Sequence, residues 1–255
     1  MLAKARSLPC DVVVLDLEDS VAPDAKDAAR LQVCAALKDY PGREVVVRIN
    51  SLDTLLGQAD LDAVRAAAPD AILLPKVENA ATITAAQGKV PLWAMIETPL
   101  GVLNVAAIAA AGPQCLAIGT NDLLAAMHGQ PLPDRRNLWA ALSQTVIAAR
   151  AHGLGVIDGT YNDINDATGF ADSCVQGRAF GFDGKTLIHP GQIETCNRVF
   201  APSADEIADA RRIIAAFADN PGQGAIALDG RMVERLHAQD AARLLALADA
   251  IESRA

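Results

Sequence analysis

The feature that most constrains this chain is a regular alternation of short apolar runs with longer segments of helical patterning. Each short run is nearly continuous in apolar side chains and does not alternate with polar ones. Continuous runs are typical of strands covered on both faces in a parallel sheet. Seven strands are predicted: Asp11–Leu17, Glu44–Ile49, Ala71–Lys76, Leu92–Ile96, Cys115–Gly119, Gly155–Asp158 and Thr186–Ile188.

Helical segments are predicted between these strands and after the last one. Those between the strands are Ala25–Lys38, Asp60–Ala67, Ala80–Gln87, Leu100–Ala111, Leu138–His152 and Asp166–Phe180. The end of the chain is predicted to be helical over Ser203–Phe217 and Ala238–Ser253, with Ser203 and Glu206 in a capping-box pattern. No linker-like stretch divides the chain. We therefore expect a barrel domain over residues 1–200 and a helical extension over residues 201–255, which packs on the barrel or on a neighbouring subunit.

Alternating strands and helices give either a doubly wound sheet or a TIM (β/α)8-type barrel, both of the α/β class. No GxGxxG or GxxxxGK[ST] pattern follows the first strand, which disfavours a nucleotide-binding fold. Polar residues instead follow several different strands, as in barrel active sites. They are Glu18, Asp19, Arg48, Asn50, Lys76, Glu97, Asp122, Asp158 and His189.

Only seven strands are found, whereas a complete barrel has eight. The segment before Asp11 is predicted to be helical and leaves no room for another strand. We therefore expect an incomplete barrel with a gap between the Asp11–Leu17 and Thr186–Ile188 strands. Because unpaired buried backbone groups are costly, the gap should be closed by distortion, by another segment or by a partner subunit.

Composition excludes several classes of function. The net charge is −9, which disfavours binding to nucleic acid or to an anionic membrane surface. No apolar run reaches the ~20 residues of a membrane span, and the N-terminus lacks a signal-peptide pattern. The five cysteines are scattered with no CxxC pair, which indicates a reducing, cytoplasmic location without disulfides or a zinc site.

The two acids Glu97 and Asp122 are the strongest candidates for chemistry. Each follows a buried strand, and one helical crossover separates them. Two carboxylates brought together repel unless a proton or a cation lies between them. A hard divalent ion that keeps several water ligands, most plausibly Mg²⁺, would satisfy both acids. The alternative is that both acids cap helices or pair with lysine.

Positively charged residues at the same strand ends have two interpretations each. Arg48 could grip a substrate carboxylate with its planar fork, or it could form an internal salt bridge to Glu18 or Asp19. Lys76 could be a Schiff-base nucleophile, although electrostatic support is favoured beside so many acids. Lys185 and His189, around the last strand, are expected to have positional or phosphate-contacting roles.

Several long motifs resemble the citrate lyase beta-subunit family of the HpcH/HpaI aldolase/citrate lyase superfamily. The resemblance runs in order from about Leu2 to about Ala248. The motifs are LDLEDSVAPDAKDAAR, VVVRINS, ILLPKVE, MIETPLGVLN, GTNDL, GFDGKTLIHPGQI and NRVFAPSADEIADA.

The resemblance implies a TIM barrel with a helical extension, assembled as a homotrimer or hexamer. It implies cleavage or formation of a C–C bond between an acyl-thioester enolate and a 2-oxo acid, on acyl-CoA or an acyl carrier protein. Citrate lyase alpha and gamma subunits are then candidate partners. By the same resemblance, Glu97 and Asp122 bind Mg²⁺ and Arg48 binds the oxo-acid end. Glu18, Asp19 and Glu234 complete the catalytic candidates, and Lys76 and Thr98 the substrate-binding ones.

Two departures from the family pattern bear on this inference. Relatives begin with a strand of the type RSxLFVPG, which is absent here. Either the chain is a shortened form or its start lies further upstream. Relatives that act on CoA thioesters often carry an aspartate in the C-terminal extension, supplied across a subunit interface. In the string GRMVERL this chain has Glu234 instead, a carboxylate one methylene longer.

The favoured function is a Mg²⁺-dependent lyase that cleaves a citryl-, malyl- or citramalyl-thioester to an acyl thioester and a 2-oxo acid. Chelation of the substrate hydroxyl by the metal would lower its pKa, as this cleavage requires. A thioester hydrolase or a malate-synthase-like condensing enzyme on the same scaffold is the first alternative. A non-catalytic paralogue is the second, supported only by the missing strand.

Overall fold

The computed structural model describes residues 2–254. The chain divides into two compact units, the first ending at Cys196 and the second beginning at Asn197. No helix among the described residues is long and apolar enough to cross a membrane.

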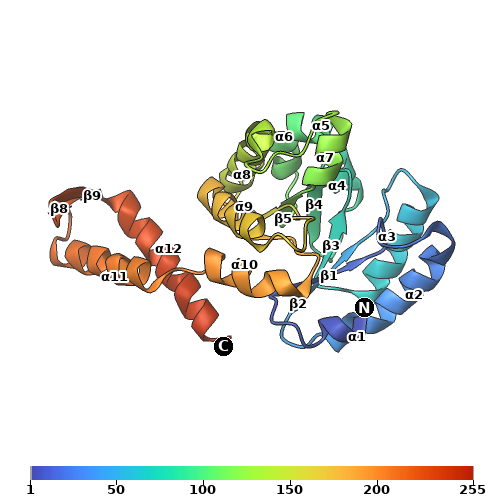
Figure 1. Ribbon diagram of the computed structural model, residues 1–255, viewed down its shortest axis with the longest axis horizontal. Helices are drawn as coiled ribbons and strands as arrows, with labels where there is room; N and C mark the ends of the chain where they lie inside the picture. The colour runs from blue at the N-terminus through green and yellow to red at the C-terminus, as the bar shows by residue number, and fades with distance from the viewer. Residues whose placement is uncertain (1, 255) are drawn as a thin grey trace. The chain divides into compact units, whose positions relative to one another are not determined.

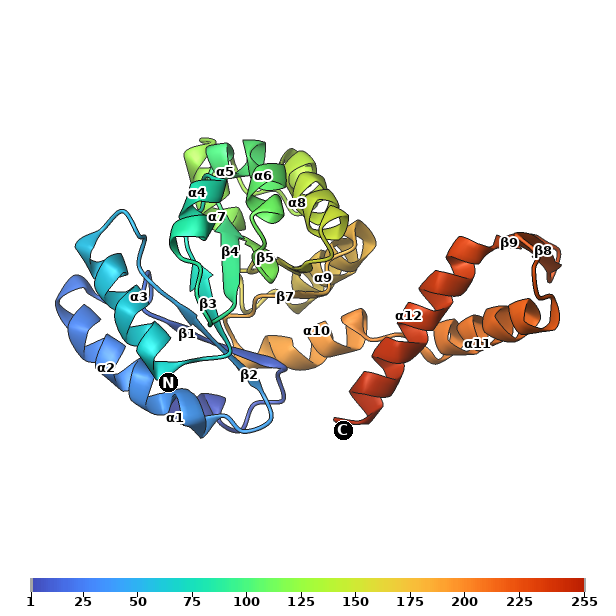
Figure 2. The same ribbon diagram turned by 180° about the vertical axis from the view of Figure 1, so that it is seen from behind.

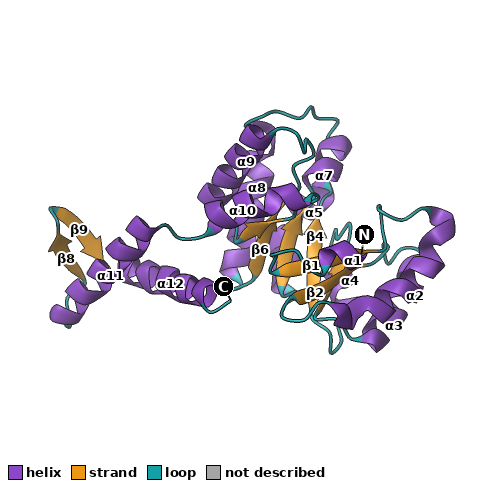
Figure 3. Cartoon of the chain, turned by 60° about the horizontal axis from the view of Figure 1, so that its bottom comes forward, coloured by secondary structure: helices purple, strands orange, loops and turns teal. Residues whose placement is uncertain are grey.

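The first unit is built on one curled sheet of seven parallel strands (Figure 3). Each strand pairs with the next one along the chain, in the order β1 to β7, which is the connectivity of a TIM barrel. Among residues 2–254 no ladder joins β7 to β1, so the sheet forms a partial barrel. The strands are β1 (Val12–Asp16), β2 (Glu44–Arg48), β3 (Ala71–Leu74), β4 (Leu92–Ile96), β5 (Cys115–Ile118), β6 (Gly155–Asp158) and β7 (Gly184–Lys185).

The prediction of an incomplete, seven-stranded barrel is confirmed, but the position of its last strand was wrong. The strand is Gly184–Lys185, not Thr186–Ile188. The Thr186 amide still donates to the Asp158 carbonyl, at 2.9 Å. The Ile188 amide, however, turns to the side chain of Gln192, and Ile188 is exposed. The apolar run therefore belongs to the turn after the strand.

The open side of the barrel leaves one apolar strand residue uncovered. Val14 lies in the middle of β1, yet 38% of its surface is exposed, because no described segment pairs with the free edge of β1. By contrast, β3, β4 and β5 are buried at every position. The interior cluster that fills the barrel consists of Val46, Ala71, Leu73, Trp93, Met95, Cys115 and Ala117.

Helices flank the strands of this unit (Figure 1). They are α1 (Leu2–Ala5), α2 (Lys26–Ala36), α3 (Leu55–Ala67), α4 (Ala80–Ala85), α5 (Pro99–Leu103), α6 (Val105–Ala110), α7 (Thr120–Ala126), α8 (Trp139–Ala151) and α9 (Ala167–Phe180). Helix α10 (Ile193–Phe200) begins in this unit and ends in the second.

Several helices differ from the sequence prediction, and helix α10 was not predicted. The helix expected from Asp60 begins at Leu55, because the Thr54 hydroxyl caps it by accepting from the Gly57 amide. The helix expected over Leu100–Ala111 is broken at Asn104, whose side-chain amide donates to the Glu78 carbonyl. The short helix α7, directly after β5, was not predicted.

The second unit is a helical pair joined by a β-hairpin (Figure 2). Helix α11 (Ala204–Asp219) packs against α12 (Arg235–Glu252), and the capping box of Ser203 and Glu206 is present as predicted. The hairpin of β8 (Ala225–Leu228) and β9 (Arg231–Glu234) was not predicted. Its two-residue turn, Asp229-Gly230, has positive φ at both positions, and Asp-Gly between apolar residues is a strong hairpin signal.

Candidate functional site

The candidate site lies at the carboxyl ends of β1 to β5. Parallel strands end at one rim, so side chains from distant parts of the sequence meet there. The rim brings together Asp16, Glu18 and Asp19 from β1, Arg48 from β2, Lys76 from β3, Glu97 and Thr98 from β4, and Asp122 from the helix after β5.

Arg48 is the centre of an ion-pair network. Its Nε and Nη2 donate to the two carboxylate oxygens of Asp16 at 2.7 and 2.6 Å, a bidentate pair. Its Nη1 lies 3.0 Å from Glu18 and 3.5 Å from Asp19. The expected internal partners were Glu18 and Asp19, whereas the principal partner is Asp16. Sequence reasoning missed Asp16, although Asp16 and Arg48 share one register position of adjacent strands.

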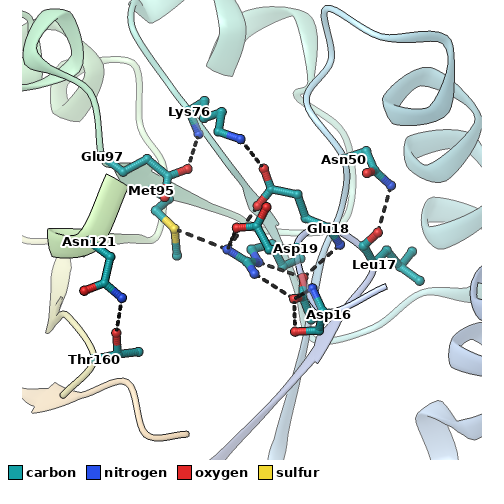
Figure 4. Close-up of polar contacts among 12 residues, drawn as sticks. Asp16, Leu17, Glu18, Asp19, Asn50, Lys76, Met95, Glu97, Asn121 and Thr160 are labelled. Atoms are coloured by element: carbon teal, nitrogen blue, oxygen red, sulfur yellow. Dashed lines mark hydrogen bonds and ion pairs between the residues drawn. The ribbon is translucent and has the colours of Figure 1, made fainter. Parts of the chain in front are cut away.

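The pKa of Asp16 reflects this pairing. Burial raises the pKa of the carboxyl, but the hydrogen bonds and charge of Arg48 outweigh burial. Hydrogen bonds from the Ser20 hydroxyl and the Glu18 amide add to the effect, and the pKa falls to about 2. Asp16 is therefore a permanent anion that holds the Arg48 fork (Figure 4).

Glu18 and Lys76 form the next contact along the rim. Lys76 Nζ donates to Glu18 Oε1 at 2.9 Å (Figure 4), and 44% of the lysine side chain is exposed. Burial raises the pKa of Glu18, opposed by Lys76 and Arg48. Glu18 thus links the two cations, and the exposed Lys76 ammonium faces solvent at the strand ends.

The backbone of Lys76 is in the left-handed region, with φ of 50°. This conformation is unfavourable by roughly 1–2 kcal/mol for a residue with a Cβ. It directs the Lys76 amide to Glu97 Oε1, at 2.7 Å (Figure 4). The turn after β3 therefore orients the Glu97 carboxylate.

Glu97 is only 2% exposed and carries the most perturbed carboxylate of the rim. Burial raises its pKa to about 7; the Lys76 amide opposes the rise, and the charges of Glu18 and Asp122 add to it. Within residues 2–254 no donor bonds its second oxygen, Oε2. Gly119 packs beside that oxygen, and a Cβ at position 119 would lie 2.5 Å from it.

Asp122 lies in the first turn of α7, partly exposed. Its charge adds to the rise in the pKa of Glu97, so Asp122 lies close enough to act on that acid. Neither acid forms an ion pair with a lysine among the described residues. Lysine pairing is one part of the alternative interpretation of these two acids and helix capping is the other, and a metal-binding role for the two acids stays a prediction.

The donor set fits Mg²⁺ better than a metal that prefers nitrogen or sulfur. The described residues contain no cluster of three or more His, Cys, Asp or Glu arranged to hold a metal ion. Mg²⁺ is commonly held by one or two carboxylates, with water and substrate as its other ligands. Glu97 offers an oxygen without a donor, and Asp122 adds a second charge. These two acids are the residues that could hold the ion.

Other predicted site residues have structural partners. The Thr98 hydroxyl caps α5 by accepting from the Gly101 amide at 3.0 Å. Lys185 is buried against Asp158 at 2.8 Å, and Arg135 pairs with the same carboxylate. His189 caps the 3-10 helix η4 (Pro190–Gln192), where its Nδ1 accepts from the Gly191 amide.

Glu234 belongs to the second unit. It is the N-cap residue of α12 and shares a reciprocal capping box with His237, whose Nδ1 accepts from the Glu234 amide at 2.9 Å. A role for Glu234 in acid–base chemistry stays a prediction.

The fold is a partial TIM barrel, and its strand ends carry two acids, Glu97 and Asp122, together with Arg48. The fold and the site thus define a class of TIM-barrel proteins with a charged rim. A family model for HpcH/HpaI aldolase/citrate lyase matches residues 1–190, and the chain belongs to that family. This confirms the resemblance found in the motifs.

The names of individual relatives indicate two different activities. The chain is 48% identical to a (3S)-malyl-CoA thioesterase of Cereibacter sphaeroides, over 98% of this chain and 90% of that protein. It is 38% identical to the citrate lyase subunit beta of Leuconostoc mesenteroides, over 98% of this chain and 89% of that protein. The expectation of a lyase is therefore less well supported than its hydrolase alternative.

A solved structure agrees in fold. CitE from Mycobacterium tuberculosis, in complex with magnesium, acetoacetate and coenzyme A, superposes with a TM-score of 0.83 at 35% identity. The match covers 97% of this chain and 92% of that one. That homologue is bound to magnesium and to coenzyme A, which are the metal and one of the acyl carriers that the resemblance in the motifs implied.

Proposed function

We propose that this protein is a Mg²⁺-dependent hydrolase of a hydroxydicarboxylic acyl-CoA thioester of the (3S)-malyl-CoA type. The observation that favours hydrolysis over C–C cleavage is the 48% identity to a (3S)-malyl-CoA thioesterase along 98% of the chain. The acids and cations at the strand ends suit an anionic substrate in a molecule whose net charge is −9.

Arg48 and Lys76 would bind the substrate carboxylate. Asp16 occupies Nε and Nη2 of Arg48, and Glu18 lies 3.0 Å from Nη1, so a ligand would bind Nη1 on the side of Asp19. Asp19 is the weakest partner of Nη1, at 3.5 Å and with 59% of its side chain exposed, so a substrate carboxylate would displace it. Lys76 Nζ, linked to Nη1 through Glu18, would contact the same carboxylate.

Glu97 and Asp122 would hold the metal. When bound there, Mg²⁺ polarises an oxygen of the substrate and lowers the pKa of a bound water. Glu97 would bring Oε2 to this site, because its Oε1 is held by the Lys76 amide. Occupying the site requires Glu97 to give up its proton.

Hydrolysis needs a base that takes the proton of the attacking water, while the thiolate of coenzyme A leaves as a thiol. Asp19 is the exposed acid of the rim, and Glu234 is the acid of the second unit that the family pattern indicates. Separate Asp19→Asn and Glu234→Gln variants distinguish these two candidates, because the variant that lacks the base should lose most of its rate of thiol release while it keeps the Mg²⁺ affinity of wild type.

The test is a product balance on (3S)-malyl-CoA with Mg²⁺. A hydrolase releases one free thiol and one malate per substrate consumed, with no glyoxylate. Glyoxylate and acetyl-CoA without free thiol would show a lyase instead. Chelation by EDTA should stop the reaction, and restored Mg²⁺ should recover it. Thiol release that is unaffected by EDTA would contradict the metal-dependent mechanism.

The second candidate is the lyase itself, favoured by the 38% identity to a citrate lyase subunit beta. It would cleave citryl-, malyl- or citramalyl-thioesters of CoA or an acyl carrier protein, with alpha and gamma subunits as partners in the carrier-bound case. A malate-synthase-like enzyme would be recognised by malate and free thiol formed from acetyl-CoA and glyoxylate. We also propose a homotrimer or hexamer, which light scattering at several protein concentrations would test.

A further inference from the structure

Residues Gly119 to Asp122 form the N-cap and first turn of α7, and the last of them is one of the two candidate metal ligands. The α-helix begins without a capping side chain, because its N-cap position is Gly119. Backbone donors in the first turn of a helix lack intrahelical partners, so an uncapped start is poorly fixed by the helix itself. Something else must hold the segment that carries Asp122.

Close packing limits movement of this segment on two sides. A Cβ on Gly119 would lie 2.5 Å from both Cβ and Oε2 of Glu97, so the backbone already touches that side chain. A Cβ on Gly159, the first residue after β6, would lie 2.6 Å from the Thr120 hydroxyl. The segment therefore rests against β4 on one side and against the end of β6 on the other.

The Gly119 amide donates to the Ile96 carbonyl at 3.0 Å, and hydrogen bonds from Asn121 provide a further restraint. Its side-chain amide nitrogen donates to Asn162 Oδ1 at 3.1 Å and to the Thr160 hydroxyl at 3.2 Å, the second of which is drawn in Figure 4. Asn162 returns a bond from its own amide to Asn121 Oδ1, at 2.9 Å. The pair is reciprocal, so neither amide can rotate without losing two bonds.

The loop that receives Asn121 is itself anchored. Gln192 is buried, and its side-chain amide donates to the Tyr161 carbonyl at 2.9 Å. The Tyr161 hydroxyl donates to Asp166 at 2.6 Å. The loop after β6 is thus fixed to the turn after β7, and it offers Asn121 a rigid acceptor.

We propose that Asn121, Thr160 and Asn162 form a bridge of positioning residues that holds the Asp122 carboxylate opposite Glu97 at the separation a shared divalent cation requires. The inference rests on the proposed metal site. Its physical basis is that the start of α7 has no capping side chain, so without the bridge the segment that carries Asp122 is free to move away from Glu97. The bridge opposes this movement, so the site is formed before the metal arrives.

Calorimetric titration of Mg²⁺ into the metal-free protein tests the bridge. Asn121→Ala and Asn162→Ala should each weaken Mg²⁺ binding about 10-fold, the usual effect of losing a group that orients a metal ligand. The double variant should be no weaker than Asn121→Ala, because that single change already removes the reciprocal pair with Asn162 and the bond to Thr160. Asn137→Ala is the matched control: Asn137 donates from its amide to the Gln130 carbonyl, and its loss should leave Mg²⁺ affinity unchanged.

Thermal melting of the metal-free variants separates positioning from folding. If the bridge positions Asp122, the Asn162→Ala protein must bind Mg²⁺ more weakly than wild type, although its substitution lies outside α7. Mg²⁺ affinities within twofold of wild type in both single variants would overturn the bridge. So would a fall in affinity that merely parallels the melting temperature and also occurs in Asn137→Ala. Failure of wild type to bind Mg²⁺ would instead sink the proposed metal site.

Discussion

The two halves of the rim differ in whether their charged side chains have a partner of opposite charge. Along β1 to β3, every charged side chain has a partner: Asp16 and Glu18 neutralise Arg48, and Glu18 also pairs with Lys76. Along β4 and β5, Glu97 and Asp122 have no cationic side chain bonded to them among the described residues. The first half is complete within the chain, whereas the second has excess negative charge that a proton or a metal can relieve.

This contrast separates charges that are balanced within the chain from charges that are not. The half along β1 to β3, in which the charges are paired, stabilises the fold. It leaves only the outer edge of the Arg48 guanidinium and the Lys76 ammonium facing a ligand. The unpaired half costs stability in the absence of a ligand, since burial raises the pKa of Glu97 to about 7. Perturbed acids of this kind are concentrated at functional sites.

The largest expected effect comes from removing an acid of the unpaired half. Asp122→Ala should weaken Mg²⁺ binding by about 1,000-fold, or ~4 kcal/mol, because one of two charged ligands is lost. Calorimetry on the metal-free protein measures it. Asp134→Ala, an exposed acid away from Glu97, should bind as wild type does. Equal affinity in Asp122→Ala and wild type would remove Asp122 from the site.

Glu97→Gln should stabilise the metal-free protein above pH 7. The folded-state pKa of about 7 exceeds the ordinary 4.5, so the carboxylate opposes folding. The penalty is absent below pH 4.5, grows between pH 4.5 and 7, and is full above pH 7, at about 3 kcal/mol. Chemical denaturation at pH 5 and pH 8 checks the sign. Glu194→Gln, at an exposed position, should show no such gain.

Arg48→Lys should lower thioester hydrolysis about 100-fold, because an ammonium cannot hold both Asp16 oxygens and still face the substrate. The variant should remain folded by circular dichroism. Arg30→Lys changes an arginine of similar burial that pairs with Asp60, and it should keep its activity. Near-normal turnover in Arg48→Lys would make Arg48 a structural partner only.

The smallest effect concerns the paired half. Asp16 has a folded-state pKa of about 2 against an ordinary 3.8, so its ionised form stabilises the fold. That contribution is full above pH 3.8, is lost as pH falls through 2, and amounts to about 2 kcal/mol. The Asp16→Asn protein should lack this stabilising contribution at pH 7, whereas the Asp62→Asn protein, which is changed at an exposed position, should be as stable as wild type. Denaturation midpoints of the three proteins at pH 7 provide the comparison.

Much of the rim could be predicted from the sequence because parallel strands end at a common edge. Arg48, Lys76, Glu97 and Asp122 each follow an apolar run, and that order along the chain placed them together. Asp16 was missed because it completes the apolar run itself. Its pairing with Arg48 depends on strand register, which the local pattern does not contain.

Local patterns determined the parallel α/β fold, six of its seven strands, the capping box at Ser203 and the family. These follow from apolar periodicity and from side-chain groups within a few residues of each other. Tertiary structure alone decided that Lys76 turns its amide to Glu97, that the Thr186–Ile188 run leaves the sheet, and that Asn121 bonds Asn162. The reason is physical: a hydrogen bond between distant segments depends on where packing brings two backbones, and burial sets the pKa of Glu97 only once those backbones have closed around it.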